Sequence, residues 1–151
     1  MKVALSSDHR GFRAKELIKS FLTAGGHTIQ DFGCNSSSSC DYPDHAFQGA
    51  TAVASGQCDR GILFCGTGIG MSVSANKVAG IRAALCHDEL TAEMSRRHNN
   101  ANVLCIPADL LGDELLRRVV DIWIRTDYEG GRHDRRLQKI AEYENSICSK
   151  R

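Results

Sequence analysis

The chain has 151 residues, of which 42% are hydrophobic and 25% charged, and its formal net charge at pH 7 is +1. This length suits one domain with a sizeable core, and we predict a single domain over residues 1–151. The balanced charge favours neither nucleic acid nor a membrane surface as a partner.

The N-terminus and the cysteines both indicate a reducing compartment. The N-terminal apolar run, Val3 to Leu5, has three residues, too few for a secretory signal, and no apolar run approaches the length of a membrane span. The seven cysteines are odd in number and show neither a CxxC pair nor the cysteine and histidine spacing of a zinc finger. We therefore expect free thiols in a cytoplasmic protein.

The first third of the chain predicts two strands, each followed by a helix. Residues 2–6 are a short apolar strand, and apolar residues at helical spacing then continue to the glycine pair Gly25-Gly26, which suits a helix C-terminus. Residues 27–32 form a second strand and residues 33–41 a polar, serine-rich loop. Pro43 then suits the first turn of a helix that continues to Gly56.

The rest of the chain continues this alternation of strands and helices. The expected strands are residues 62–65, 81–86 and 102–106, and the expected helices are residues 71–80, 89–98, 113–125 and about 132–148. Five strands alternating with helices predict an α/β fold, a three-layer α/β/α Rossmann-like sandwich with a five-stranded parallel sheet. In such folds the ligand crevice lies outside the carboxyl ends of the strands.

The third strand runs into a glycine-rich turn, and the stretch 61–71 has the sequence GILFCGTGIGM. A buried strand, a glycine turn and a helix N-terminus together make an anion or oxyanion site, because unpaired N–H groups converge there. A dinucleotide site is an alternative, with Asp88 at a suitable distance for a ribose partner, although the spacing is GxGxG rather than GxGxxG. Cys65 stands at the lip of the turn, where it is either a packed thiol or a thiolate base.

Two histidines and two arginines are further candidates. His9 follows the first strand and His98 precedes the fifth, and each is either a structural residue or a proton carrier near neutral pH. Arg132 and Arg136 are four residues apart, so they lie on one helix face and form either a solvated basic turn or a clamp for phosphate or carboxylate. A bound anion would relieve the conflict between these cations and the helix dipole.

With these residues collected, the chain resembles the ribose-5-phosphate isomerase B family, which also includes allose-6-phosphate and galactose-6-phosphate isomerases. The matching segments are residues 7–12 (SDHRGF), 41–44 (DYPD), 65–70 (CGTGIG), 75–77 (ANK), 80–83 (GIRA), 97–103 (RHNNANV) and 128–133 (YEGGRH). They follow the family's order, and as a set they are highly specific.

The resemblance implies reversible conversion of ribose 5-phosphate into ribulose 5-phosphate through an enediolate, with no metal or organic cofactor. Cys65 would be the base that carries the proton between C1 and C2. The developing oxyanion would be held by the backbone amides of Gly66, Gly68 and Gly70 and by the hydroxyls of Thr67 and Ser72.

The resemblance also implies roles for residues outside the turn. His98, aided by Asp8, would open the furanose ring. Asn99 would bind sugar hydroxyls or the enediolate, and Tyr42 would line the pocket. The phosphate clamp would comprise His9, Arg132 and Arg136.

The family's pocket is shared across a homodimer, so part of the clamp would come from the second subunit. The last helix would contribute to the dimer, and dimers could pair into a tetramer. One departure stands out: many members have an arginine shortly after the fifth strand that adds to the phosphate site, whereas this chain has Asp109. An acidic residue there would repel phosphate at short range.

Three other functions stay open at this stage. The nearest is an isomerase that prefers a six-carbon sugar phosphate such as allose 6-phosphate. The others are a binding module without turnover and a thiol redox protein built on Cys65, although no second cysteine lies within a few residues of it.

Overall fold

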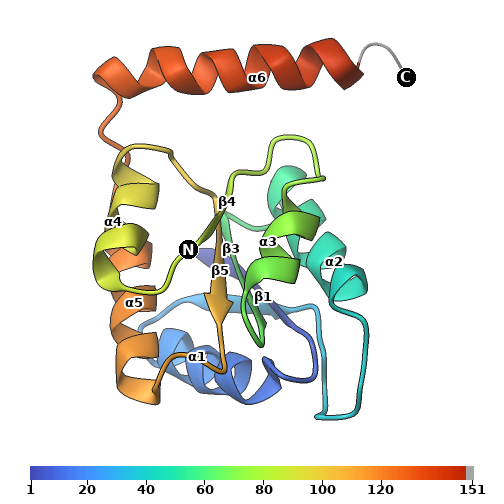
Figure 1. The fold of residues 1–151 in the computed structure, drawn as a ribbon. Helices are drawn as coiled ribbons and strands as arrows, with labels where there is room; N and C mark the ends of the chain where they lie inside the picture. Colours follow the sequence, from blue (N-terminus) through green and yellow to red (C-terminus); the bar gives the residue numbers. More distant parts are fainter. Residues whose placement is uncertain (149–151) are drawn as a thin grey trace.

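A computed structural model describes residues 1–148, which form one parallel sheet flanked by helices (Figure 1). The strands are β1 (Lys2–Ser7), β2 (Thr28–Asp31), β3 (Arg60–Cys65), β4 (Ala83–Leu85) and β5 (Val103–Pro107). Their order in the sheet is β2-β1-β3-β5-β4, and every pairing is parallel. The predicted five-stranded parallel sheet is therefore confirmed.

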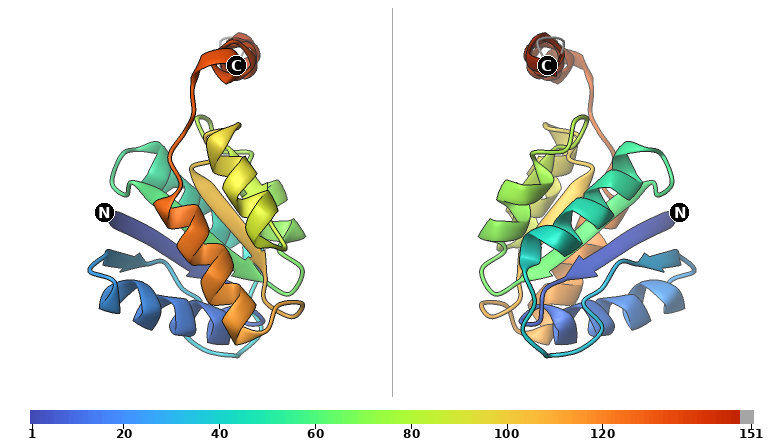
Figure 2. Two further views of the ribbon diagram at one scale, coloured as in Figure 1. Left: turned by 90° about the vertical axis from the view of Figure 1, so that its left-hand side faces the viewer. Right: turned by 90° about the vertical axis from the view of Figure 1, so that its right-hand side faces the viewer.

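Helices cover both faces of this sheet, which gives the predicted three layers (Figure 2). One face carries α1 (Phe12–Ala24), α4 (Glu89–Arg97) and α5 (Asp113–Arg125), and the other carries α2 (Tyr42–Ala54) and α3 (Ile69–Ala75). Successive strand residues point to opposite faces, so Ile62 packs under α1 and α5 while Leu63 packs under α2 and α3. Within the described residues, no helix has both the length and the apolar character that a membrane crossing needs.

The fourth strand is shorter than expected, with three residues instead of the six predicted over 81–86. It is an edge strand that pairs only with β5, and asparagine side chains replace backbone partners at its start. The Asn76 side chain donates to the Ala83 carbonyl and accepts from the Ala83 N–H, both at 2.9 Å, while Asn102 Oδ1 accepts from Arg82 N at 2.8 Å. These amides satisfy the backbone where strand pairing stops.

The last helix, α6 (Asp134–Cys148), stands apart from the three layers (Figure 1). A 3-10 turn, Gly131–His133, precedes it, so the helix predicted from about residue 132 begins two residues later. The Gly80 N–H donates to Glu144 Oε2 at 2.9 Å. The apolar side chains of Ile140, Tyr143 and Ile147 are 48–70% exposed, so this chain leaves the apolar side of α6 largely uncovered.

Candidate active site

A cavity of about 360 Å³ opens at the carboxyl ends of β1 and β3. We call its lining residues the thiol half-site: Asp8, Arg10, Tyr42, Cys65, Gly66, Thr67, Gly70 and Asp109. In parallel α/β folds the ligand crevice is expected at these carboxyl ends of the strands. Ser72, expected nearby, is on α3 beyond the lining residues.

Cys65 is the last residue of β3, and its side chain belongs to the core under α2 and α3 while remaining 5% exposed at the cavity. The loop after β5 is tied to this position, because Ala108 N donates to the Cys65 carbonyl at 2.9 Å and Asp109 N donates to the Gly66 carbonyl at 3.1 Å. A Cβ on Gly66 would lie 2.6 Å from Asp109 Oδ2. The absence of that Cβ lets the two loops approach closely.

Gly68 is the N-cap residue of α3 and lies in the left-handed region, with φ +72°. A Cβ at this position would lie 2.5 Å from Leu85 Cδ1 and 3.0 Å from the Ile106 carbonyl carbon. A Cβ on Gly70 would meet the Tyr42 ring at 2.8 Å, so the helix turn presents bare backbone to the cavity.

Replacing Gly68 by alanine is expected to cost about 2–4 kcal/mol of the free energy of unfolding, from backbone strain and overpacking together. Urea denaturation measures this loss. The matched control is Gly80→Ala, since Gly80 has a similar φ of +79° with nothing within 4 Å of an added Cβ. Equal losses in the two variants would show that close packing at Gly68 has no part in the effect.

Asp8 organises the turn between β1 and α1. Its Oδ1 accepts hydrogen bonds from Arg10 N and Gly11 N, both at 2.9 Å, and the residue is only 6% exposed. This geometry directs the Arg10 side chain toward Asp109, with Nε and Nη2 at 2.7 Å and 2.5 Å from Asp109 Oδ2. Asp109 thus lies in the cavity with its charge paired to Arg10.

Arg10 was not among the predicted site residues, although it lies inside the SDHRGF segment. The only available signal was its position two residues after Asp8 at the end of the first strand. His9, its neighbour, lies against the loop before α2, with Nδ1 3.3 Å from both the backbone N and the carbonyl O of Cys40. His9 is therefore placed at the same end of the sheet as Cys65.

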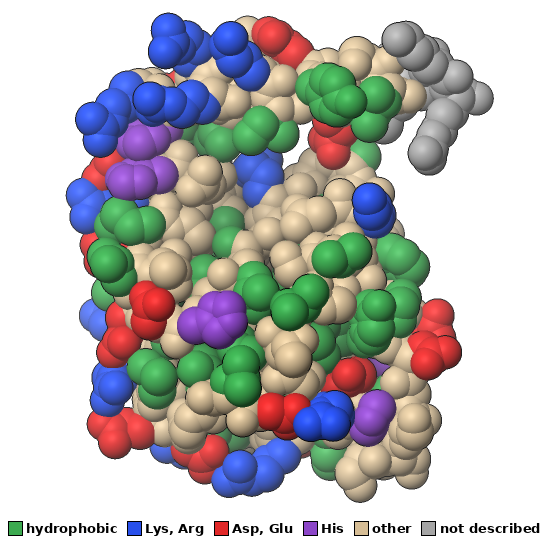
Figure 3. Space-filling view, in the orientation of Figure 1, with side chains coloured by type: hydrophobic (Ala, Val, Ile, Leu, Met, Phe, Trp, Pro, Cys, Tyr) green, Lys and Arg blue, Asp and Glu red, His purple; other side chains and the backbone are tan. Residues whose placement is uncertain are grey.

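A second group, which includes four predicted site residues, gathers where α4 ends and α6 begins. We call it the arginine half-site: it comprises the predicted residues His98, Asn99, Arg132 and Arg136 together with Glu129 and His133, which were not predicted to be in the site. Figure 3 shows basic and histidine side chains gathered over this end of α6. Arg136 Nη1 donates to the Arg132 carbonyl at 3.3 Å, which links the 3-10 turn to the first turn of α6.

Two histidine rings stack in this half-site. The rings of His98 and His133 have centroids 4.4 Å apart and planes 12° apart. Glu129 Oε2 lies 3.8 Å from His98 Nε2 and 3.6 Å from His133 Nε2. Burial, helped by His98 and the two nearby arginines, lowers the pKa of His133 below its usual value.

The two half-sites lie at opposite ends of the strands: the thiol half-site is at the carboxyl ends of β1 and β3, and α4 ends near the start of α6 beyond the amino ends (Figure 1). Cys65 pairs with Pro107 at one end of the β3–β5 ladder and Gly61 pairs with Val103 at the other, which is about 13 Å of strand. His98 and Asn99 precede β5, so they lie beyond the amino end of that ladder. Asp8 and His98 were expected to act together, and within one chain the fold separates them.

Asn99 lines a different cavity, of about 290 Å³, where Leu137 and Ile140 of α6 face the body of the chain. Its carbonyl accepts a hydrogen bond from Arg82 Nε at 3.2 Å. The predicted site residues therefore form two separate groups in a single chain, one with the thiol and one with the arginines.

Comparison with known proteins assigns this arrangement to a family. The profile of the family described as Ribose/Galactose Isomerase matches residues 3–140. Putative sugar phosphate isomerase YwlF of Bacillus subtilis is 49% identical, with 95% of this chain and 97% of that protein covered. Ribose-5-phosphate isomerase B of Escherichia coli is 46% identical, covering 95% and 96%, and the D-erythrulose-4-phosphate isomerase of Pectobacterium atrosepticum is 38% identical, covering 96% of each.

Solved structures agree with these sequence relatives. Ribose-5-phosphate isomerase B of Clostridium thermocellum superposes with a TM-score of 0.96 at 46% identity, covering 97% of this chain and 99% of the other. The enzyme of Mycoplasma genitalium, solved with bound ribulose 5-phosphate, gives a TM-score of 0.91 at 41% identity, covering 95% and 96%.

Proposed function

The chain belongs to the ribose/galactose isomerase family and is a sugar-phosphate isomerase, and we propose that it interconverts ribose 5-phosphate and ribulose 5-phosphate. The observation that carries this proposal is the position of Cys65. It is the last residue of β3, and it lines the 360 Å³ cavity beside the glycine turn. The relative solved with ribulose 5-phosphate supports the choice of sugar.

Cys65 is the proposed base. As a thiolate it removes the proton from C2 of the open-chain aldose, which leaves an enediolate with the negative charge on O1. The hydroxyl proton of O2 passes to O1, and the Cys65 thiol returns the carbon proton to C1 of the enediolate, which gives the ketose. The backbone amides of residues 66–70 and the Thr67 hydroxyl stabilise the oxyanion that forms between the two steps. The proton count balances without an external acid, and the scheme uses no metal or organic cofactor.

We propose that a second copy of the chain completes each site. In this homodimer the thiol half-site of one chain meets the arginine half-site of the other, so that Arg132, Arg136, His98 and Asn99 reach the sugar from the partner. The separation of the half-sites in one chain and the uncovered apolar side of α6 support this arrangement. His9 belongs to the Cys65 end, so the phosphate would lie between residues of both chains. Pairing of dimers into a tetramer fits the same scheme.

The six described cysteines outside α6 are all free thiols, which supports a cytoplasmic location for the proposed enzyme. They also argue against a redox function for Cys65. Its buried neighbour Cys105 is held as a thiol, because burial raises its pKa well above the usual value.

The competing six-carbon substrate is tested by measuring kcat/KM for ribose 5-phosphate and allose 6-phosphate on the purified enzyme. We expect at least about a tenfold preference for ribose 5-phosphate, because the Arg10–Asp109 pair occupies the cavity wall and limits the length of the sugar. The control is Asp109→Ala, which removes part of that wall and should narrow the preference. A higher value for allose 6-phosphate with the unmodified chain would contradict the proposal, and binding of both sugars without turnover would indicate a binding module.

A further inference from the structure

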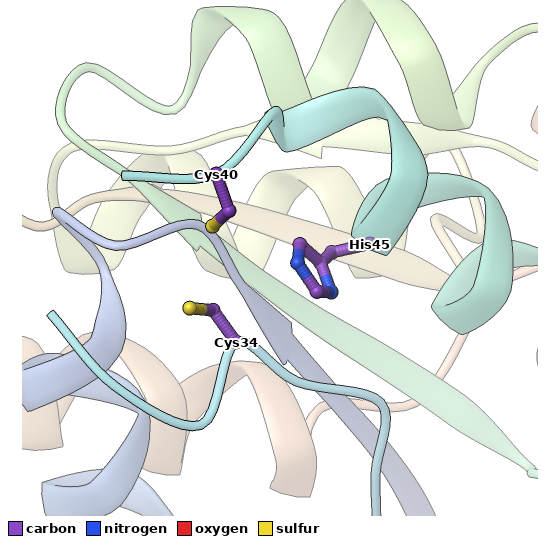
Figure 4. Close-up of side chains that lie close together, drawn as sticks. All are labelled: Cys34, Cys40 and His45. Carbon is purple, nitrogen blue, oxygen red and sulfur yellow. The ribbon is translucent and has the colours of Figure 1, made fainter. Parts of the chain in front are cut away.

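The loop between β2 and α2 brings two cysteines and a histidine together (Figure 4). Cys34 lies at the start of this loop, Cys40 near its end, and His45 in the first turn of α2. One ligand atom from each residue, the two sulfurs and a ring nitrogen, lies within 4.8 Å of the other two. Cys34 is buried and the other two residues are partly buried, so the cluster is shielded but reachable from solvent.

The histidine of this cluster is held in one orientation. His45 Nδ1 lies 3.0 Å from the Phe32 carbonyl oxygen, which can only accept, so Nδ1 carries the hydrogen and the Nε2 lone pair is free in the neutral ring. Figure 4 shows a ring nitrogen on the side of the two sulfurs. A backbone carbonyl that fixes one nitrogen while the other faces soft ligands is the outer-shell arrangement found for metal-binding histidines.

The surrounding backbone keeps this orientation. Ser6 Oγ donates to the His45 carbonyl at 2.7 Å, which anchors the start of α2 on β1. On the other side of the ring, a Cβ at Gly33 would lie 2.9 Å from His45 Nδ1. The site therefore rests on packing and hydrogen bonds outside the cluster as well as on its own residues.

We propose that Cys34, Cys40 and His45 bind a zinc ion. Two thiolates and an imidazole are the donors that Zn²⁺ prefers, and water would take the fourth tetrahedral position. On binding, each thiol releases its proton to solvent, and two thiolates with a neutral imidazole balance the two charges of the ion. The spacing Cys-x5-Cys-x4-His differs from that of zinc fingers, and only the fold brings the residues together.

The proposed ion would act as a positioning element for the neighbouring sugar site, separate from the proton transfer at Cys65. His9 contacts the backbone of Cys40, and Tyr42, two residues further on, packs its ring at Gly70 inside the cavity. An ion that fixes the loop between Cys34 and Cys40 would therefore fix two residues of the substrate pocket. We expect its removal to raise KM more than it lowers kcat.

The test is metal binding by the full-length reduced protein, measured independently of activity. After removal of metals with a chelator, titration with Zn²⁺ should load about one ion per chain, and Co²⁺ should give the near-ultraviolet absorption of thiolate-to-cobalt charge transfer. The variants Cys34→Ser and Cys40→Ser should lose both signals. The matched control is Cys58→Ser, a buried thiol in the turn between α2 and β3 whose replacement should leave both signals intact.

Several results would overturn the proposal. One is the absence of zinc uptake and charge transfer in the reduced protein; another is uptake that persists in a folded Cys34→Ser/Cys40→Ser variant, which would assign the ion to His98, Glu129 and His133. A native Cys34–Cys40 disulfide, seen as a mass lower by about 2 Da, with no metal uptake after reduction, would make the pair a redox site instead. Circular dichroism of each variant without metal separates loss of ligands from loss of fold.

Discussion

Isomerisation by the Cys65→Ala variant is expected to fall by about 10²–10⁴-fold in kcat, the range found when a general base is removed. The fold should survive, because the change removes one sulfur atom from a residue that packs at the rim of the core. The measurement is the steady-state rate on ribose 5-phosphate, together with circular dichroism and a thermal unfolding curve. Turnover near that of the unmodified enzyme would refute the assigned base and would make Asp8 the next candidate, because its carboxylate lines the thiol half-site and is not paired with the Arg10 guanidinium.

The control for this experiment is Cys105→Ala. Cys105 lies on the neighbouring strand, in the same core cluster as Cys65, and is fully buried. It undergoes the same chemical change without touching the cavity. This variant should keep its kcat even if its unfolding temperature falls, which distinguishes loss of a base from loss of packing.

Mixing two defective variants is expected to restore activity if each site is built from two chains. Cys65→Ala damages only the thiol half-site and Arg136→Ala only the arginine half-site. In a mixed dimer one site receives both defects and the other receives neither. Random reassociation of equal amounts should therefore give about a quarter of the unmodified activity, since half of the dimers are mixed and each has one intact site. The rate is measured below KM, where the binding defect of Arg136→Ala is fully expressed, because loss of a charged hydrogen bond costs about 1.5–3 kcal/mol.

The matching control pairs Cys65→Ala with Cys65→Ser. Both changes fall in the thiol half-site, so every mixed dimer still has one defect in each site and no activity should return. Recovery in the first mixture alone identifies a shared site. Equal activity in the two mixtures would show that each chain holds a complete site, in conflict with the separation of the half-sites seen in the fold.

Local sequence patterns were sufficient for most of the fold. The helix predicted over residues 113–125 has those bounds in α5, because its apolar stripe is strong and Gly112 precedes it. The strand predicted over 81–86 was too long, because at its start Arg82 and Ala83 bond the side chains of Asn102 and Asn76 in place of a neighbouring strand. An apolar run indicates which residues are buried, but a strand extends only as far as its backbone pairs with a neighbouring strand.

The site was harder to predict than the fold, because it depends on whether a residue lies at the carboxyl or the amino ends of the strands. Asp8 and His98 both flank strands. Asp8 follows β1 and His98 precedes β5, so they lie at opposite ends of the parallel strands. Asp109 looked like an isolated repulsive charge, and its partner Arg10 is 99 residues away in the chain. The cluster around Cys34 had no sequence signal, since a loop closes it.

The detached position of α6 has a consequence for the newly synthesised chain. Neither core cluster contains a residue of α6, so the packing of the three layers is complete with α5. If the site is shared between two chains as proposed above, a chain can finish folding its core and still lack a complete active site until it associates with a second copy. Activity per molecule then depends on abundance, and at low copy number the cell would hold folded but idle subunits.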